Sequence, residues 1–463
     1  MPTMKMPRQL LVAALAAATL AITAAPAAPA GPNLSGYAWQ AIYGTGDSAL
    51  ANGNIYAIKS VGPDLFLGGD FTDFAGINAA DRLVRWNGTV LEWQAIGSVG
   101  EGDGAITAGS VRAIEVSGNN IYIGGDFTVT DYLGNPRANL AWYTLPDPTF
   151  TGYWDFQWRG FDGLTHADAV WNGVVNTITE IGGFLYVGGE FTDGADNPEN
   201  DNLMLGYHSF CFTDAVSACV AAAPDVTVCG GVTISCVINP PNLWQSPGNN
   251  GAGTGALNGA VSSIMALQSG GAFVAGNFLD AAGNTGMSYV ARYVPYGAPE
   301  WNAVSGIPST MWATASLGSG QYVAGWEGAY RYVSSTAWEE ICPTALHQTG
   351  FIWTGIAAIS DSLVFVAGAD GRLQACNPNT GVATAVPGST TSYRLANHRG
   401  DLLVTGSVNV GGLIGTGNFI ARYTDLLPPT NRDPRGGIET AVLLATLAAL
   451  TALAGTQLLR RRA

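Results

Sequence analysis

One short motif recurs along the chain, and its repetition constrains the fold more than any other feature. An apolar run leads into two glycines, an acidic residue and Phe, reading DLFLGGDFT at Asp64–Thr72, NIYIGGDFT at Asn120–Thr128 and GFLYVGGEFT at Gly183–Thr192. A fourth copy, GAFVAGNFLD at Gly271–Asp280, keeps the second glycine. Glycine inside a strand normally weakens the strand, so its recurrence at one place in a strand pattern indicates a structural repeat.

Each copy stands at the same place in a longer unit of strand patterns. An apolar segment such as Val111–Ile114 comes first, the Gly-Gly segment second, and an alternating segment such as Arg82–Gly88 third. A segment centred on tryptophan closes the unit, as at Trp93, Trp158, Trp301 and Trp338. Four short strands in roughly 40–60 residues, repeated, are typical of the blades of a β-propeller.

Weaker copies extend the series to seven units. The last glycine of each copy is Gly69, Gly125, Gly189, Gly276, Gly325, Gly368 or Gly406. The long interval between the third and fourth of these glycines contains a cysteine-rich segment, which predicts an insertion over about residues 207–257. The expected fold is therefore an all-β, seven-bladed β-propeller over residues 31–425.

The two ends of the repeat region predict how the ring closes. The last unit has its third strand, Phe419–Tyr423, but lacks a following tryptophan strand, whereas a lone tryptophan strand, Gly36–Ile42, precedes the first unit. If this N-terminal strand completes the last blade, the ring closes without an exposed sheet edge.

The paired glycines are predicted to serve packing. Glycine lets another backbone approach where a Cβ atom would collide, and inner strands crowd toward the propeller axis. The Phe that follows each pair is expected to fill the space between blades: Phe71, Phe127, Phe191 and Phe278. No helical pattern follows these glycines, so a phosphate-binding loop is not indicated.

The Gly-Gly-x-Phe-Thr core, the Ala-Arg-Trp/Tyr strand and the closing tryptophan together resemble kelch-like and related glycine-rich β-propeller repeats of bacterial and fungal cell-surface proteins. The resemblance covers about residues 36–424. It implies the architecture, but it implies no particular activity, because propellers serve many unrelated functions.

The first thirty residues have the features of a signal peptide. Lys5 and Arg8 precede an apolar run, Leu10–Ala24, and Ala28-Pro29-Ala30 supplies small residues at the cleavage region. Residues 1–30 are therefore expected to direct export and to be removed. The alternative, a membrane-anchoring first helix, would need a longer apolar run.

The C-terminal region, residues 426–463, predicts attachment to the cell surface. Ala441–Leu459 is an uncharged apolar stretch close to the roughly 20 residues needed to span a bilayer, and Arg460–Arg462 follow it. Upstream, Leu427-Pro428-Pro429-Thr430-Asn431 resembles the Leu-Pro-x-Thr-Gly motif of sortase sorting signals, with Asn431 where glycine is usual. The resemblance implies cleavage after Thr430 and linkage to the cell envelope. The alternative is an uncleaved transmembrane anchor.

Composition and cysteine usage fit an exported protein. The net charge is −15, which disfavours nucleic-acid partners and anionic lipid surfaces. The six cysteines are Cys211, Cys219, Cys229, Cys236, Cys342 and Cys376. An even number in an exported chain predicts disulfides, two within the first four and one between the distant last pair. Zinc binding by the first four is the alternative, but no Cys-x-x-Cys occurs.

A polar residue follows most of the core glycines, and it admits two interpretations. Asp70, Asp126 and Glu190 could form a ring of carboxylates that holds Ca²⁺ at one mouth of the channel. Alternatively, each carboxylate accepts hydrogen bonds from turn amides of its own blade, which the repetition favours. The sequence identifies no catalytic residue and no other cofactor site.

The sequence thus favours a surface-attached propeller that binds an extracellular protein or glycan over a nucleic-acid-binding or catalytic protein. The alternative is an extracellular hydrolase or oxidoreductase that acts at the channel mouth. Acids or histidines converging at one mouth would favour the enzyme; repeated carboxylates hydrogen-bonded within their own blades would favour binding. Four tryptophans fit the repeat less well: Trp154, Trp171, Trp353 and, inside the predicted insertion, Trp244.

Overall fold

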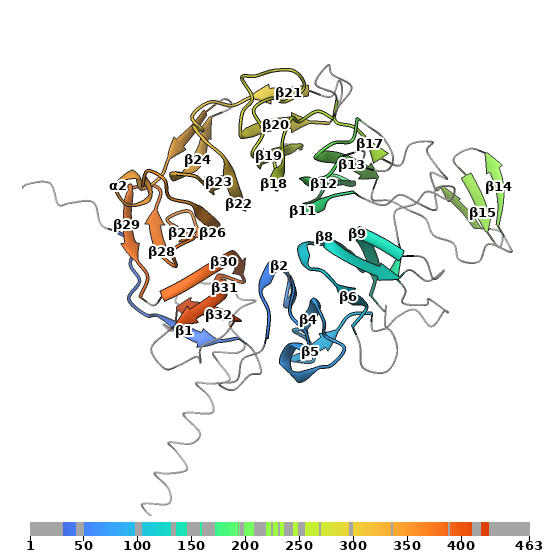
Figure 1. Cartoon of the computed structure of the whole chain (residues 1–463), viewed down its shortest axis with the longest axis horizontal. Helices are drawn as coiled ribbons and strands as arrows, with labels where there is room; N and C mark the ends of the chain where they lie inside the picture. The colour runs from blue at the N-terminus through green and yellow to red at the C-terminus, as the bar shows by residue number, and fades with distance from the viewer. Residues whose placement is uncertain are drawn as a thin grey trace, which may run out of the picture.

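The chain folds into a ring of seven β-sheets, each of which forms one propeller blade (Figure 1). The computed structural model describes residues 31–42, 51–97, 104–130, 136–145, 158–159, 172–192, 194, 199–207, 219–223, 226–229, 232–235, 244–248, 255–267, 270–295, 300–334, 337–387, 389–409 and 418–425. Helical turns among them are short: η1 (Phe74–Gly76) and α2 (Pro343–Leu346). The all-β, seven-bladed fold predicted from the repeats is confirmed.

In each blade the innermost strand lies at the channel and the other strands follow it outward. Blades one to three are β2 (Ile55–Val61), β3 (Asp64–Gly69), β4 (Leu83–Asn87), β5 (Glu92–Ala95); β7 (Val111–Ser117), β8 (Asn120–Thr130), β9 (Pro136–Thr144), β10 (Trp158–Arg159), with β6 (Ile106–Ala108) beside β8; and β11 (Val174–Ile181), β12 (Phe184–Glu190), β13 (Leu203–Tyr207), β17 (Trp244–Gln245).

The remaining blades repeat this order, and the Gly-Gly segments and their weaker copies form the second strand throughout. Blades four to seven are β18 (Val261–Ala266), β19 (Ala272–Gly276), β20 (Val290–Val294), β21 (Glu300–Ala303); β22 (Met311–Leu317), β23 (Gly320–Gly325), β24 (Gly328–Ser334), β25 (Ala337–Glu340); β26 (Trp353–Ser360), β27 (Leu363–Gly368), β28 (Leu373–Asn377), β29 (Val382–Ala385); and β30 (Ser389–His398), β31 (Asp401–Asn409), β32 (Asn418–Asp425), β1 (Tyr37–Ala41).

The N-terminal strand closes the ring, as the sequence predicted. β1 pairs antiparallel with β32, with Tyr37 opposite Asp425. The last blade also contacts the first: the Thr405 hydroxyl donates to the Ile55 carbonyl at 3.0 Å. The outer edge of blade seven is therefore paired by a strand from the other end of the chain.

The insertion interrupts blade three between its third and outermost strands. β14 (Cys219–Ala223), β15 (Val226–Cys229) and β16 (Val232–Ser235) form a separate three-stranded antiparallel sheet, drawn outside the ring in Figure 1. Trp244, which the sequence analysis placed inside the insertion, lies instead in β17 and pairs with β13. The closing tryptophan strand of blade three was thus missed because the insertion separates it from its own blade.

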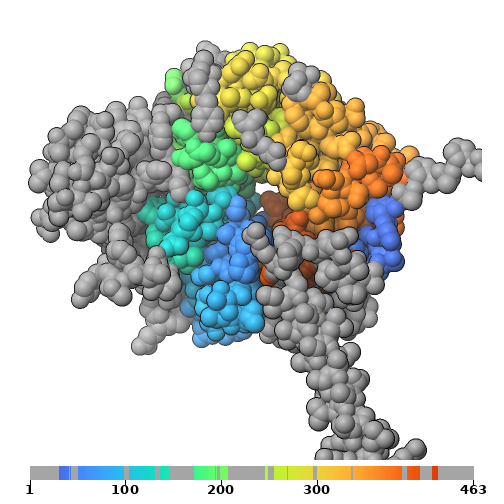
Figure 2. Space-filling model, turned by 180° about the vertical axis from the view of Figure 1, so that it is seen from behind, coloured from blue at the N-terminus to red at the C-terminus, as the bar shows by residue number. Residues whose placement is uncertain are grey.

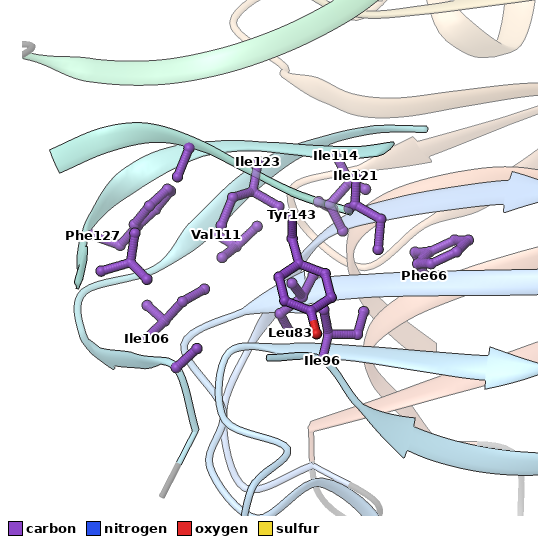
Figure 3. Packing of buried hydrophobic residues seen from close by; sticks show 14 residues of the cluster. Phe66, Leu83, Ile96, Ile106, Val111, Ile114, Ile121, Ile123, Phe127 and Tyr143 are labelled. Carbon is purple, nitrogen blue, oxygen red and sulfur yellow. The ribbon is translucent and has the colours of Figure 1, made fainter. Parts of the chain in front are cut away.

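The core of the protein is divided among the contacts between blades. Each of the main clusters of buried apolar residues joins two consecutive blades, including one that joins the last blade to the first. Figure 3 shows the cluster between blades one and two, where Phe66 and Leu83 of one blade lie near Ile121 and Ile123 of the next. Phe127 in this cluster is 2% exposed, which confirms the predicted role of the Phe after the glycine pair.

The two glycines of each pair have different contacts. A methyl group on the second glycine would meet backbone of its own blade; at Gly125 it would lie 2.0 Å from the Ser110 carbonyl oxygen. A methyl group on the first would meet a side chain of the next blade; at Gly124 it would lie 2.3 Å from Val175 Cγ1. The predicted packing role is confirmed, with close backbone approach at the second glycine.

The distant cysteines form the predicted disulfide. Cys342, which follows β25, is bonded to Cys376 of β28, and both are fully buried. The bond therefore links the end of blade five to the third strand of blade six. Of the other four cysteines, Cys219 and Cys229 are register partners across β14 and β15, whereas Cys211 and Cys236 lie outside the described residues.

Replacing both Cys342 and Cys376 by alanine should lower the free energy of unfolding by about 3–4 kcal/mol, because the bond closes a long loop in the unfolded chain. The sequence separation is 34 residues. Urea unfolding followed by tryptophan fluorescence measures the difference, and reduced wild-type protein is the control. A loss below about 1 kcal/mol would show that the bond does not restrain the unfolded chain as expected.

The predicted targeting segments lie outside the described residues. These are the signal peptide at residues 1–30, the sorting motif from Leu427 to Asn431 and the transmembrane helix at Ala441–Leu459. Within the part of the chain that the structure describes, no helix has the length and apolar character needed to cross a membrane.

Candidate functional site

Every inner strand carries a β-bulge at the same level, opposite the residues of the second strand that correspond to the glycine pair. In blade one, Ile55 pairs with Gly69 and Ala57 with Gly68, so Tyr56 is the extra residue. The corresponding residues around the ring are Tyr56, Arg112, Asn176, Ser262, Trp312, Thr354 and Tyr393. Because a bulge redirects side chains out of the regular alternation, it changes which residues face the channel.

The bulges surround a cavity of about 150 Å³ at one end of the channel, here called the channel mouth. Figure 2 shows the opening at the centre of the ring. All seven inner strands contribute lining residues, which include Tyr56, Arg112, Asn176, Trp312 and Arg394. The charged residues among the described lining are both arginines, although the whole chain carries a net charge of −15.

Arg394 stands where the other blades have small residues. It directly follows the bulge of β30, and the equivalent residues are Ala57, Ala113, Thr177, Ser263, Ala313 and Gly355. These small side chains leave the space that the cavity occupies. Burial and the nearby Arg112 cation both lower the pKa of the Arg394 guanidinium. Arginine nevertheless remains protonated in proteins, so two positive charges line this cavity.

The carboxylates after the glycine pairs accept hydrogen bonds within their own blades. Asp70 accepts from the Asn54 side-chain amide at 2.9 Å and from the Tyr56 hydroxyl at 3.0 Å. Asp126 accepts from the Ser110 backbone amide at 2.8 Å. These are the contacts expected from the turn interpretation.

Arg112 and Glu190 continue the same pattern. Arg112 Nη2 donates to Asp126 at 3.2 Å, and the Asn176 side-chain amide donates to Glu190 at 3.4 Å. Among the described residues, no group of three or more His, Cys, Asp or Glu is arranged to hold a metal ion. Calcium binding by Asp70, Asp126 and Glu190 stays a prediction.

In blades one to three, the bulge residue and the carboxylate after the second glycine are both polar, whereas blade five has tryptophan at both positions. Its bulge residue is Trp312, and Trp326 occupies the position after the second glycine, Gly325, where blades one to three carry Asp70, Asp126 and Glu190. The two side chains are 37% and 38% exposed, which is unusual for tryptophan. Neither was singled out from the sequence, although their positions in the aligned repeat could have revealed them.

The opposite end of the inner strands holds a partly buried ion pair. Lys59 Nζ lies 2.7 Å from the Glu115 carboxylate, whose pKa is raised by burial despite the Lys59 charge. Glu180 accepts a hydrogen bond from the Gly183 amide in its own turn at 2.7 Å. These acids therefore have structural partners.

The described histidines lie apart from one another. His398 is buried at the end of β30 and makes a 2.6 Å hydrogen bond through Nδ1 to the Ser60 hydroxyl. Burial and the nearby cations of Arg399 and Arg422 lower its pKa to about 4. His347 contacts Glu340 at 2.9 Å, after the outermost strand of blade five. The described histidines thus do not converge at the channel mouth.

Two of the tryptophans that fit the repeat less well are placed by the structure. Trp353 begins β26 and is fully buried, with its indole N–H donating to the Leu346 carbonyl at 2.8 Å. It occupies the core position held by Val111 in blade two. Trp244 closes blade three, whereas Trp154 and Trp171 lie outside the described residues.

No family model matches the chain, and no curated protein matches it. Solved structures align over most of its length at low similarity. YCF48 bound to a D1 peptide is 11% identical, with a TM-score of 0.44, covering 87% of this chain and 99% of that chain. U3-55K is 12% identical, with a TM-score of 0.44, covering 85% and 99%. The extracellular domain of a two-component-system protein from B. thetaiotaomicron is 12% identical, with a TM-score of 0.43, covering 83% and 39%.

Proposed function

We propose that this protein is an exported, cell-surface-attached β-propeller that binds an extracellular protein or glycan at the channel mouth. The observation that carries the proposal is the exposure of Trp312 and Trp326 beside a cavity lined by Arg112 and Arg394. Large aromatic side chains and arginine are the residues that most often dominate binding interfaces. The propeller holds Trp312, Arg112 and Arg394 on strands, which favours a preformed site.

Export and attachment are supported by the two ends of the sequence. The features of residues 1–30 are those of a signal peptide, and the apolar stretch Ala441–Leu459 follows the sorting-like motif that begins at Leu427. The buried disulfide between Cys342 and Cys376 suits an oxidising compartment. In this arrangement the propeller lies outside the cell.

An array of glycans and cell-surface proteins, probed with the purified full-length chain, tests the function. We expect saturable and selective binding that is lost, by about tenfold or more, in the double variant Trp312→Ala, Trp326→Ala, because truncating a central tryptophan typically costs at least 2 kcal/mol. Val333→Ala is the matched control, since Val333 is 40% exposed on β24 of the same blade. Binding that survives in the double variant would exclude the channel mouth as the binding site.

The same array with EDTA tests the calcium interpretation. We expect binding to be unchanged, because Asp70 and Asp126 already accept hydrogen bonds from their own blades. Loss of binding that calcium restores would instead support a metal site formed by Asp70, Asp126 and Glu190.

A further inference from the structure

We propose that the channel mouth binds an anionic saccharide, with the carboxylate of a sugar acid held by Arg112 and Arg394 and the sugar ring packed against Trp312. This inference rests on the proposed function, because it names the ligand class of the same site. It is carried by the charge of the cavity, its size, its polar lining and the exposed aromatic residues at its rim.

The charge of the cavity favours an anion. Arg112 and Arg394 line it together, and no carboxylate is found among its described lining residues. Asp126 neutralises Arg112 in part, through a 3.2 Å ion pair in which both side chains are 40% exposed. Two like charges close together repel each other at low dielectric, so a bound carboxylate would stabilise the pair.

Arg112 retains capacity to donate hydrogen bonds. A guanidinium carries five N–H donors, and it matches the geometry of a carboxylate with two parallel hydrogen bonds. The Nε atom of Arg112 is buried, so a ligand in the cavity would meet the terminal Nη groups of this side chain, which is 40% exposed. The guanidinium also lies 5.7 Å from the ring centre of Tyr56, which helps hold it in place.

The size and lining of the cavity fit one sugar ring. Its volume is about 150 Å³, similar to an engineered protein cavity that accommodates benzene. Hydroxyl and amide groups from blades three to five line another part of the wall: Asn176, Thr177, Ser262, Ser263 and Thr314. Such groups can donate to and accept from sugar hydroxyls, whereas an acidic peptide segment would offer them fewer partners.

The aromatic residues supply an apolar surface for the sugar. One face of a pyranose ring presents C–H groups, which pack favourably on the electron-rich face of an indole. Trp312 lines the cavity and is 37% exposed. Trp326 directly follows Gly325, which pairs with Met311, the residue before Trp312.

Titration calorimetry with the purified full-length chain tests the inference. The probes are short oligomers of galacturonate, mannuronate and glucuronate, each beside its methyl-esterified counterpart, and an oligoglutamate peptide. We expect at least one uronate oligomer to bind, and its ester to bind about tenfold more weakly or worse, because the ester removes the charge-assisted hydrogen bonds. Wild-type protein suffices for this comparison, so it does not depend on the folding of a variant.

Two arginine variants locate the carboxylate. Arg394→Gln and Arg112→Gln should each weaken uronate binding about tenfold, by loss of a charge-assisted pair, and should leave the weak binding of the ester unchanged. Arg331→Gln is the matched control, since Arg331 lies on β24 and donates to Asn379 at 2.8 Å. Arg394→Lys keeps the positive charge but cannot make two parallel hydrogen bonds to a carboxylate. Its affinity for the uronate should therefore fall between those of the wild type and Arg394→Gln.

The outcomes separate this inference from the proposed function. Equal binding of acid and ester, binding of oligoglutamate but no uronate, or no binding of any uronate would each overturn the anionic saccharide. If the array still shows binding that depends on Trp312 and Trp326, the channel mouth remains the binding site for another ligand. If array binding is independent of both tryptophans, the proposed site itself is wrong.

Discussion

Deletion of Gly36–Ile42 is expected to lower the free energy of unfolding by about 5 kcal/mol or more, because it removes the outer strand of blade seven and the aromatic side chains on it. Tyr37 and Trp39 of β1 both pack on Tyr423 of β32, with ring centres 5.4 Å and 4.9 Å apart. The Trp39 indole N–H also donates to the Pro387 carbonyl at 2.7 Å, which ties β1 to the end of blade six. Thermal unfolding followed by circular dichroism measures the loss.

A point variant distinguishes the loss of the packing of β1 on blade seven from the effect of shortening the chain. Trp39→Ala keeps the strand but removes its main side-chain contacts, so a cost of about 3 kcal/mol is expected. The deletion should also make the protein prone to association, because β32 then presents an unpaired edge. Coincident melting curves for the deletion variant and the wild type would contradict closure of the ring by β1.

The architecture was predictable because packing requirements repeat in the sequence. Each blade must bury the same contacts against the next blade, so the glycine pair, Phe127 and its equivalents, and the closing tryptophans recur at fixed places. The pairing of Cys342 with Cys376 followed from the isolation of these cysteines from the other four. Trp244 was assigned to the insertion because the insertion separates it from the third strand of its blade, so the usual spacing between that strand and the closing tryptophan is lost.

The channel mouth was not predictable in the same way. Regular alternation places consecutive residues of a strand on opposite faces, so Tyr56 and Ala57 would not both be expected at the channel. The bulge brings both to the cavity wall. Arg394 belongs to one of the weaker copies of the repeat, where the alignment gives less guidance. Binding sites depend on what differs between blades, whereas the fold is read from what they share.

That distinction also applies within the glycine pair. The second glycine is present in all seven units, whereas the first is replaced by alanine at Ala275, Ala324 and Ala367. A methyl group at Gly125 would lie 2.0 Å from the Ser110 carbonyl oxygen, and the backbone of the bulge must move to admit it. At Gly124 the obstacle is the Val175 side chain of the neighbouring blade, which can be shortened without moving the backbone.

Gly125→Ala is therefore expected to cost about 3 kcal/mol or more, the upper range for overpacking, since the small gain from restricting the unfolded chain does not offset it. Gly124→Ala should be destabilising too, but adding Val175→Ala should recover part of that loss, because the collision is with this side chain. Val175→Ala should not rescue Gly125→Ala. Urea unfolding of the two glycine variants with and without Val175→Ala measures both couplings. If Val175→Ala rescued both variants equally, the second glycine of blade two would serve the contact between blades, and close backbone approach within the blade would not explain its presence there.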